Sequence, residues 1–190
     1  NEETYHPGEA NILMADVVII NKIDSADADD VAEVRATVRD RNPRAIIIEA
    51  ASPISVEDPS IIRGKRVLVV EDGPTLTHGE MSYGAGVVAA EKFGAEDLVD
   101  PRDNAVGSII GVYEKYPNTG MLLPAMGYGA QQVRDLEATI AATDCDAVII
   151  GTPIDLRRII HIDKPSVRVS YELQEIGHPD LKDVMARFLK

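Results

Sequence analysis

The four residues Asn21-Lys22-Ile23-Asp24 directly follow an apolar run at residues 17–20. The order N-K-x-D after a buried strand is typical of loops that recognise guanine. An aspartate carboxylate accepts hydrogen bonds from the N1 and N2 edge of guanine, a donor pair that adenine lacks, while the lysine stem covers the face of the base. The segment therefore predicts a nucleotide-binding site that includes Asn21, Lys22 and Asp24.

A second loop supports this prediction. Residues 45–48 form another short apolar run, and the segment after it reaches Ala51 and Ser52, where a backbone N–H is expected to contact the base. The alternative is a strand end followed by a polar turn and a helix cap, because Ser25 and Asp27 are good cap residues. Short motifs of this kind also occur by chance.

The phosphate-binding pattern G-x-x-x-x-G-K-[ST] is missing from the sequence. Since the chain starts at Asn1, we expect it to be the C-terminal portion of a longer protein whose upstream half binds the phosphates and most of the Mg²⁺. The cofactor is then GTP or ATP with Mg²⁺, and the chain alone should be inactive.

Composition argues against several function classes. The 190 residues carry a formal net charge of −13, which disfavours binding to nucleic acid or to an anionic membrane surface. The sequence has one cysteine and no apolar stretch long enough to cross a bilayer, so a cytoplasmic protein is expected. The four histidines are scattered without nearby His or Cys partners, so no metal site is expected.

Two segments differ in pattern, with a boundary at Gly64. The first predicts strand, helix (29–41), strand and short helix (55–62). The second predicts five strands, at residues 66–70, 96–99, 120–123, 147–150 and 166–170. Helices are predicted between and after them, at residues 84–93, 105–116, 130–143 and 180–190. This alternation predicts an α/β fold, with a parallel sheet covered by helices on both faces.

In a sheet of strand order 3-2-1-4-5, the loops after the first, third and fourth strands of the second segment meet at one edge. These loops carry glycines, hydroxyls and cations, and the first leads into a helix at residue 84, whose N-terminus favours anions. The candidates for binding a small anion are Thr75, Thr77, His78, Thr152, Arg157 and Arg158. Glu71 and Asp72 would repel an anion unless Mg²⁺ bridges them. Each residue taken alone could instead serve a turn, a cap or a surface ion pair.

Residues 64–79, 123–129 and 151–158, together with residues 5–11 and N-K-I-D, resemble the predicted GTPases related to cyclic 2,3-diphosphoglycerate synthetase. The resemblance implies that residues 1–63 complete a P-loop NTPase domain and that residues 64–190 form a Rossmann-like domain. The named enzyme of that family uses ATP to close the two phosphates of its substrate into a cyclic anhydride. N-K-I-D, in contrast, predicts guanine.

Two functions follow as expectations. The first is a nucleotide-dependent phosphoryl-transfer enzyme or ligase that binds a phosphorylated small acid. The second is a regulatory or assembly GTPase whose second domain is an interaction or dimerisation module, which would make the protein a homo-oligomer. They differ in whether the strand-end loops bind a ligand.

Overall fold

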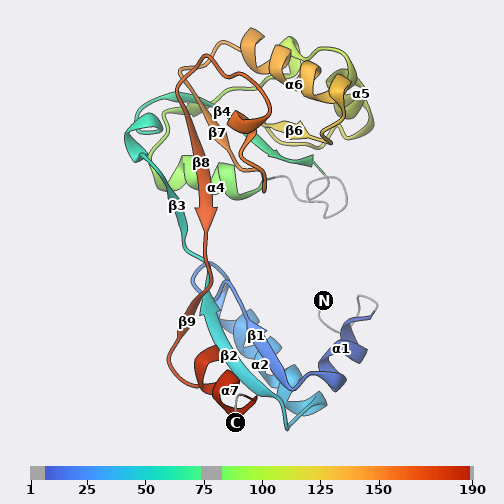
Figure 1. Cartoon of the computed structure of the whole chain (residues 1–190), viewed down its shortest axis with the longest axis vertical. Helices are drawn as coiled ribbons and strands as arrows, with labels where there is room; N and C mark the ends of the chain where they lie inside the picture. Colours follow the sequence, from blue (N-terminus) through green and yellow to red (C-terminus); the bar gives the residue numbers. More distant parts are fainter. Residues whose placement is uncertain (1–6, 74–82, 189–190) are drawn as a thin grey trace. The chain divides into compact units, whose positions relative to one another are not determined.

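The computed structural model describes residues 7–73 and 83–188 and divides the chain into two compact units (Figure 1). Unit 1 combines Asn1–Pro53 with Tyr171–Lys190, and unit 2 is Ile54–Ser170. The chain therefore passes from unit 1 to unit 2 and back again. This division differs from the single boundary expected at Gly64, because a segment before Gly64 belongs to the second unit and the C-terminal segment returns to the first.

Unit 1 contains a three-stranded sheet of order β1-β2-β9. Its elements are α1 (Gly8–Met14), β1 (Val17–Ile20), α2 (Ala28–Arg41), β2 (Ile46–Ala51), β9 (Gln174–Ile176) and α7 (Leu181–Phe188). Strand β1 pairs with β2 in parallel, and β2 pairs with β9 antiparallel. The expected α2 is confirmed, and Asp27 caps it by accepting a hydrogen bond of 2.8 Å from the amide of Asp29.

Unit 2 contains a six-stranded sheet in which β3, β8, β7, β4 and β5 follow one another and β6 also pairs with β4. Its elements are β3 (Ile54–Val56), η1 (Pro59–Ile61), β4 (Arg66–Asp72), α4 (Ala85–Lys92), β5 (Asp97–Leu98), η2 (Arg102–Asn104), α5 (Ser108–Lys115), β6 (Leu123–Ala125), α6 (Ala130–Ala142), β7 (Ala147–Ile150), η3 (Leu156–Arg158) and β8 (Ser166–Tyr171). Strand β4 pairs in parallel with β5, β6 and β7, and β7 pairs in parallel with β8.

The observed strand order agrees with the expected order at the central pair of the sheet in unit 2. Strand β4 lies beside β7, and the chain winds outward from this pair in both directions, so the two carboxyl ends form a topological switch point. The expected order is wrong for β6, which pairs directly with the end of β4 rather than lying outside β5. Strand β5 is only two residues long and pairs with the start of β4, which leaves the rest of that edge to β6.

Alternate residues of the central strands pack on opposite faces of the sheet in unit 2. Leu68 and Val70 of β4 pack with buried residues of α5 and α6, whereas Val67 and Val69 pack with those of α4. Both strands β4 and β7 are therefore buried on two sides, as their continuous apolar sequences predict. The α/β class is confirmed. In the described part of the chain, none of the helices has the length and apolar character needed to span a membrane.

Candidate ligand sites

Unit 1 brings the two predicted base-recognition loops together. Ser52 links them twice: its amide donates to Oδ1 of Asp24 at 3.2 Å, and its hydroxyl donates to Oδ1 of Asn21 at 3.0 Å. The amide of Ile23 donates to the carbonyl of Ala50 at 3.2 Å. Lys22 adopts a positive φ of 62°, which turns the chain sharply after β1. Two segments that lie far apart in sequence, residues 21–24 and 50–52, thus meet at the carboxyl ends of β1 and β2.

Some side-chain groups of these two loops remain exposed and could contact a ligand. Asp24 and Lys22 are exposed, and no described residue bonds to Oδ2 of Asp24 or to the ammonium of Lys22. The amide of Ser52, in the loop expected to present an N–H to the base, donates to Asp24 in this structure. Ala51 is buried within β2. A carboxylate oxygen beside a lysine stem is the chemistry that guanine recognition needs.

Unit 2 places Glu71 at the switch point, and the residue is only 2% exposed. Its Oε1 accepts hydrogen bonds from the amide of Gly86 at 2.7 Å and from that of Val87 at 3.1 Å, at the N-terminus of α4. A Cβ at Gly84 would lie 2.5 Å from Oε2 of Glu71, and one at Gly151 would also clash with this oxygen. These glycines therefore leave room for the carboxyl group between β7 and α4.

Burial raises the pKa of Glu71 from 4.5 to about 7, and the negative charge of Asp72 adds to the rise, while the amides of α4 oppose it. The consequence for ligand binding is direct. The sequence predicts an external anion at this helix N-terminus, whereas the structure puts the protein's own carboxyl group there. An incoming anion would have to displace Glu71.

Two of the three anion-site candidates that the structure describes are engaged inside the protein. Arg157 donates to both oxygens of Glu57 at 2.9 and 3.0 Å and also to Asp155, and these acids raise the pKa of its guanidinium. The hydroxyl of Thr152 donates to the carbonyl of Ile154 at 2.6 Å. Arg158 is exposed, and its guanidinium forms no hydrogen bond or ion pair with any described residue. Thr75, Thr77 and His78 lie outside the described residues.

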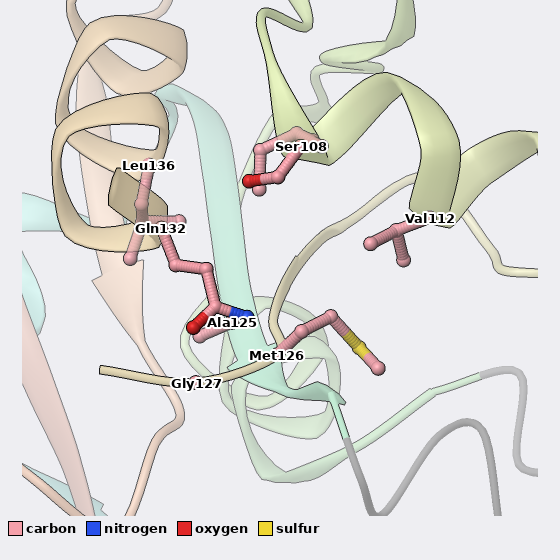
Figure 2. Close-up of a pocket in the computed structure, with 8 residues that line it drawn as sticks. Ser108, Val112, Ala125, Met126, Gly127, Gln132 and Leu136 are labelled. Atoms are coloured by element: carbon pink, nitrogen blue, oxygen red, sulfur yellow. The ribbon is translucent and has the colours of Figure 1, made fainter. Parts of the chain in front are cut away.

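A small cavity lies between α5, α6 and the end of β6 (Figure 2). Its volume of about 20 Å³ is enough for roughly one water molecule. Gln132 lies beside it and accepts a hydrogen bond of 3.3 Å from the amide of Gly129, as part of the cap of α6. The glycine-rich loop after β6 therefore serves a helix start, which is the turn alternative that its sequence left open.

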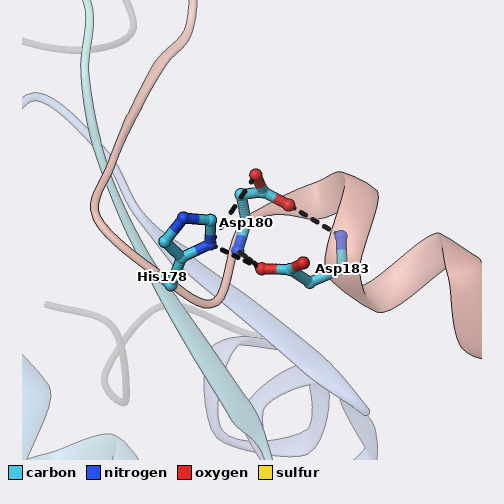
Figure 3. Close-up of side chains that lie close together, drawn as sticks. All are labelled: His178, Asp180 and Asp183. Carbon is cyan, nitrogen blue, oxygen red and sulfur yellow. Dashed lines mark hydrogen bonds and ion pairs between the residues drawn. The ribbon is translucent and has the colours of Figure 1, made fainter.

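The structure also gathers a cluster that sequence spacing missed, at the start of α7 (Figure 3). His178, Asp180 and Asp183 place their potential metal-ligand atoms within 4.8 Å of one another. Nδ1 of His178 lies 2.7 Å from Oδ2 of Asp183, and the amide of Asp183 donates to Asp180 at 2.7 Å. The carboxylate of Asp183 raises the pKa of His178. The cluster could hold a metal, but its internal bonds already explain it as the cap of α7.

Comparison with known proteins gives a match to a curated enzyme. A search of protein-family models finds none that matches the chain. A curated protein from Thermococcus kodakarensis, named "Arginine synthetase ArcE", is 60% identical over all 190 residues. The chain is similar to an arginine synthetase. It spans 42% of the length of that relative. The relative is thus named as a ligase-type enzyme, and its name differs from that of cyclic 2,3-diphosphoglycerate synthetase.

Proposed function

We propose that this chain is part of a nucleotide-dependent ligase whose product is arginine. The observation that carries the proposal is the 60% identity to the arginine synthetase, which extends over the entire chain rather than over one motif. Joining two molecules into a stable product needs an activated intermediate, and phosphoryl transfer from a nucleotide supplies it. The first of the two functions expected from the sequence, a nucleotide-dependent ligase, is therefore favoured over a regulatory GTPase.

Unit 1 supplies the base contacts in this proposal. Asp24 accepts the hydrogen bonds of the base through Oδ2, and Lys22 covers the ring, while Ser52 holds the two loops in register. The nucleotide's Mg²⁺ and phosphates are held by residues elsewhere in the complete protein. The choice between GTP and ATP is part of the proposal: N-K-I-D supports guanine.

The resemblance to cyclic 2,3-diphosphoglycerate synthetase supports a second candidate. In both candidates a nucleotide would activate an oxygen of a small acid, so a shared scaffold could serve either one. The two candidates differ in the small acid that is activated and in the product that is released.

The test is phosphorus NMR on the full-length protein in the reverse direction. Arginine, phosphate and Mg²⁺ are supplied with either ADP or GDP, and formation of the nucleoside triphosphate is followed. We expect a triphosphate signal that requires arginine, and the diphosphate that supports it identifies the base. In parallel, ATP or GTP is supplied with 2,3-diphosphoglycerate. A cyclic anhydride signal would favour the second candidate, and GTP cleavage that ignores both small molecules would favour a regulatory GTPase.

Asp24→Asn tests the base contact in the same assay. If guanine is bound, loss of the carboxylate should weaken GDP use about tenfold or more, because a charge-assisted hydrogen bond contributes about 1.5–3 kcal/mol. The matched control is Asp30→Asn, an exposed carboxylate on α2. Equal effects of the two substitutions would remove Asp24 from the base site.

A further inference from the structure

A polar groove of about 290 Å³ lies on one face of the unit 1 sheet. Helix α2 contacts β1 on this unit, and the groove is formed where α2 faces β2 and β9. Ile47 and Glu49 alternate onto the same face of β2, and Ile176 of β9 is the register partner of Glu49. The residues that line the groove are Arg35, Arg39, Ile47, Glu49 and the segment Ile176 to Pro179.

The groove carries charges of both signs over an apolar floor. Arg35 donates from Nε to Oε1 of Glu49 at 2.7 Å, and the two side chains are 32% and 31% exposed, so each remains accessible. Arg39 lies one helical turn after Arg35 on α2, and its guanidinium forms no hydrogen bond or ion pair with a described residue. In a chain of net charge −13, a guanidinium that no residue of the described part engages, beside a groove, is available to an anion. Ile176 is 47% exposed and offers apolar surface to a ligand.

We propose that this groove binds an α-amino acid, with the ligand's carboxylate on Arg39 and its cationic end on Glu49. A guanidinium binds a carboxylate through two parallel hydrogen bonds, and Glu49 can accept from an ammonium or a guanidinium in the same way. Ile47 and Ile176 contact the aliphatic stem between the two charged ends. The volume lies at the low end of ligand sites, which suits a single amino acid.

The opposite charges of the groove favour a zwitterionic ligand, and this part of the proposal does not depend on the proposed ligase activity. That the zwitterion is arginine rests on the proposed function. Arginine would present its own guanidinium to Glu49 and take the place of Arg35 in that ion pair. Binding and turnover are measured separately, so failure of one is distinguishable from failure of the other.

The test is a methyl NMR titration of the full-length protein with L-arginine in the absence of nucleotide. We expect the δ1 methyl signals of Ile47 and Ile176 to shift together with one dissociation constant. The methyl of Ile110, an exposed isoleucine on α5 of unit 2, should not follow the same curve. Unchanged Ile47 and Ile176 signals at saturating arginine would overturn the proposal.

Two further probes test which end of the ligand is recognised. Agmatine, which lacks the α-carboxylate, should bind about tenfold or more weakly than arginine because the contact with Arg39 is lost. Inorganic phosphate should shift the same methyl signals only weakly, because it cannot engage Glu49. Tighter binding of phosphate than of arginine would replace the amino-acid proposal with a simple anion site.

The matched variants are Arg39→Ala and Arg44→Ala. Arg44 is another exposed arginine of unit 1, and it does not line the groove. Arg39→Ala should weaken arginine binding about tenfold or more, with partial recovery in Arg39→Lys, whereas Arg44→Ala should leave it unchanged. Equal affinities of the two alanine variants would overturn the assignment of the carboxylate to Arg39.

Discussion

At the scale of single residues, Glu71 shows how one side chain can decide the character of a strand-end site. From the sequence, Glu71 is expected to repel an anion at this strand end. In the structure its carboxyl group is buried and accepts a hydrogen bond from the N-terminus of α4. The carboxyl group then satisfies helix amides that would otherwise bind a ligand. An anion site at this edge would therefore be gated by the position and protonation of Glu71.

The raised pKa of Glu71 predicts a pH dependence of stability. The unfolded chain releases this proton near pH 4.5, whereas the folded protein keeps it until about pH 7. The contribution of Glu71 to the free energy of unfolding is therefore greatest below about pH 4.5. It falls by about 3 kcal/mol as the pH rises from 4.5 to 7. We expect Glu71→Gln to remove most of this decline, as measured by calorimetric unfolding at pH 5 and pH 8.

The matched control for this prediction is Glu96→Gln, since Glu96 is an exposed carboxylate of the same unit. It should retain the pH dependence of the unchanged protein. A decline that persists in Glu71→Gln would show that another group is responsible. A carbon-13 titration of the Glu71 carboxyl, with a midpoint near pH 7, gives an independent measure.

Sequence could anticipate single residues when their partners follow from a local pattern. Asn21, Asp24 and Ser52 lie together because each follows a strand of the same parallel pair, and that placement was predictable. Arg157 was expected to bind an anion, but Glu57, 100 positions away in sequence, takes up its guanidinium. No spacing rule reveals such a partner, because the contact depends on how the segment before β4 packs near η3 in the folded protein.

At the scale of elements, the start of α5 depends on a residue of another helix. Asp135 of α6 accepts hydrogen bonds from the amide of Ser108 at 2.8 Å and from its hydroxyl at 2.7 Å, and these bonds lower the pKa of the carboxyl. Gly107 precedes this helix with a positive φ of 55°, and a Cβ there would lie 2.5 Å from Asp135. The cap therefore needs glycine for two reasons.

Gly107→Ala should destabilise the protein by about 1–3 kcal/mol, because it strains the backbone and displaces Asp135. Helix α5 contains its own control, Gly111, where a Cβ would meet nothing within 4 Å. Gly111→Ala should instead stabilise by about 0.5–1 kcal/mol, as expected for alanine in a helix interior. Thermal denaturation of the two variants should shift in opposite directions, and a shift in the same direction would contradict this account of the α5 cap.

Most helices and central strands were predictable, whereas the edge strands were not. Apolar runs identify β1, β2, β4 and β7, of which β4 and β7 are almost fully buried, and α2, α6 and α7 follow from helical spacing and caps. The sequence predicts a helix at residues 55–62, but these residues contain the end of β3 and all of η1, and it predicts no strand at β9. Both short strands form only because a distant strand provides their hydrogen bonds, so their own sequences carry little signal.

At the scale of the whole molecule, those two short strands decide the division of the chain. Strand β3 joins the sheet of unit 2 beside β8, and Lys92 of α4 donates to the carbonyl of Ile54 at 2.8 Å. Strand β9 joins the sheet of unit 1 beside β2. A boundary placed at Gly64 would separate β3 from its sheet and leave β9 in a piece without its partner strand.

Two truncated proteins test this division directly. Residues 54–170 should fold as an independent unit, because they contain the six-stranded sheet except the last residue of β8, and both of its apolar clusters. Residues 64–190 should melt at a temperature lower by about 5 °C or more, since loss of β3 exposes part of one cluster and about 1 kcal/mol shifts the midpoint by this amount in a small domain. In the longer piece the amides of residues 174–176 should also exchange rapidly with solvent, because β2 is absent. Equal melting temperatures, together with protected amides at residues 174–176, would instead support the boundary at Gly64.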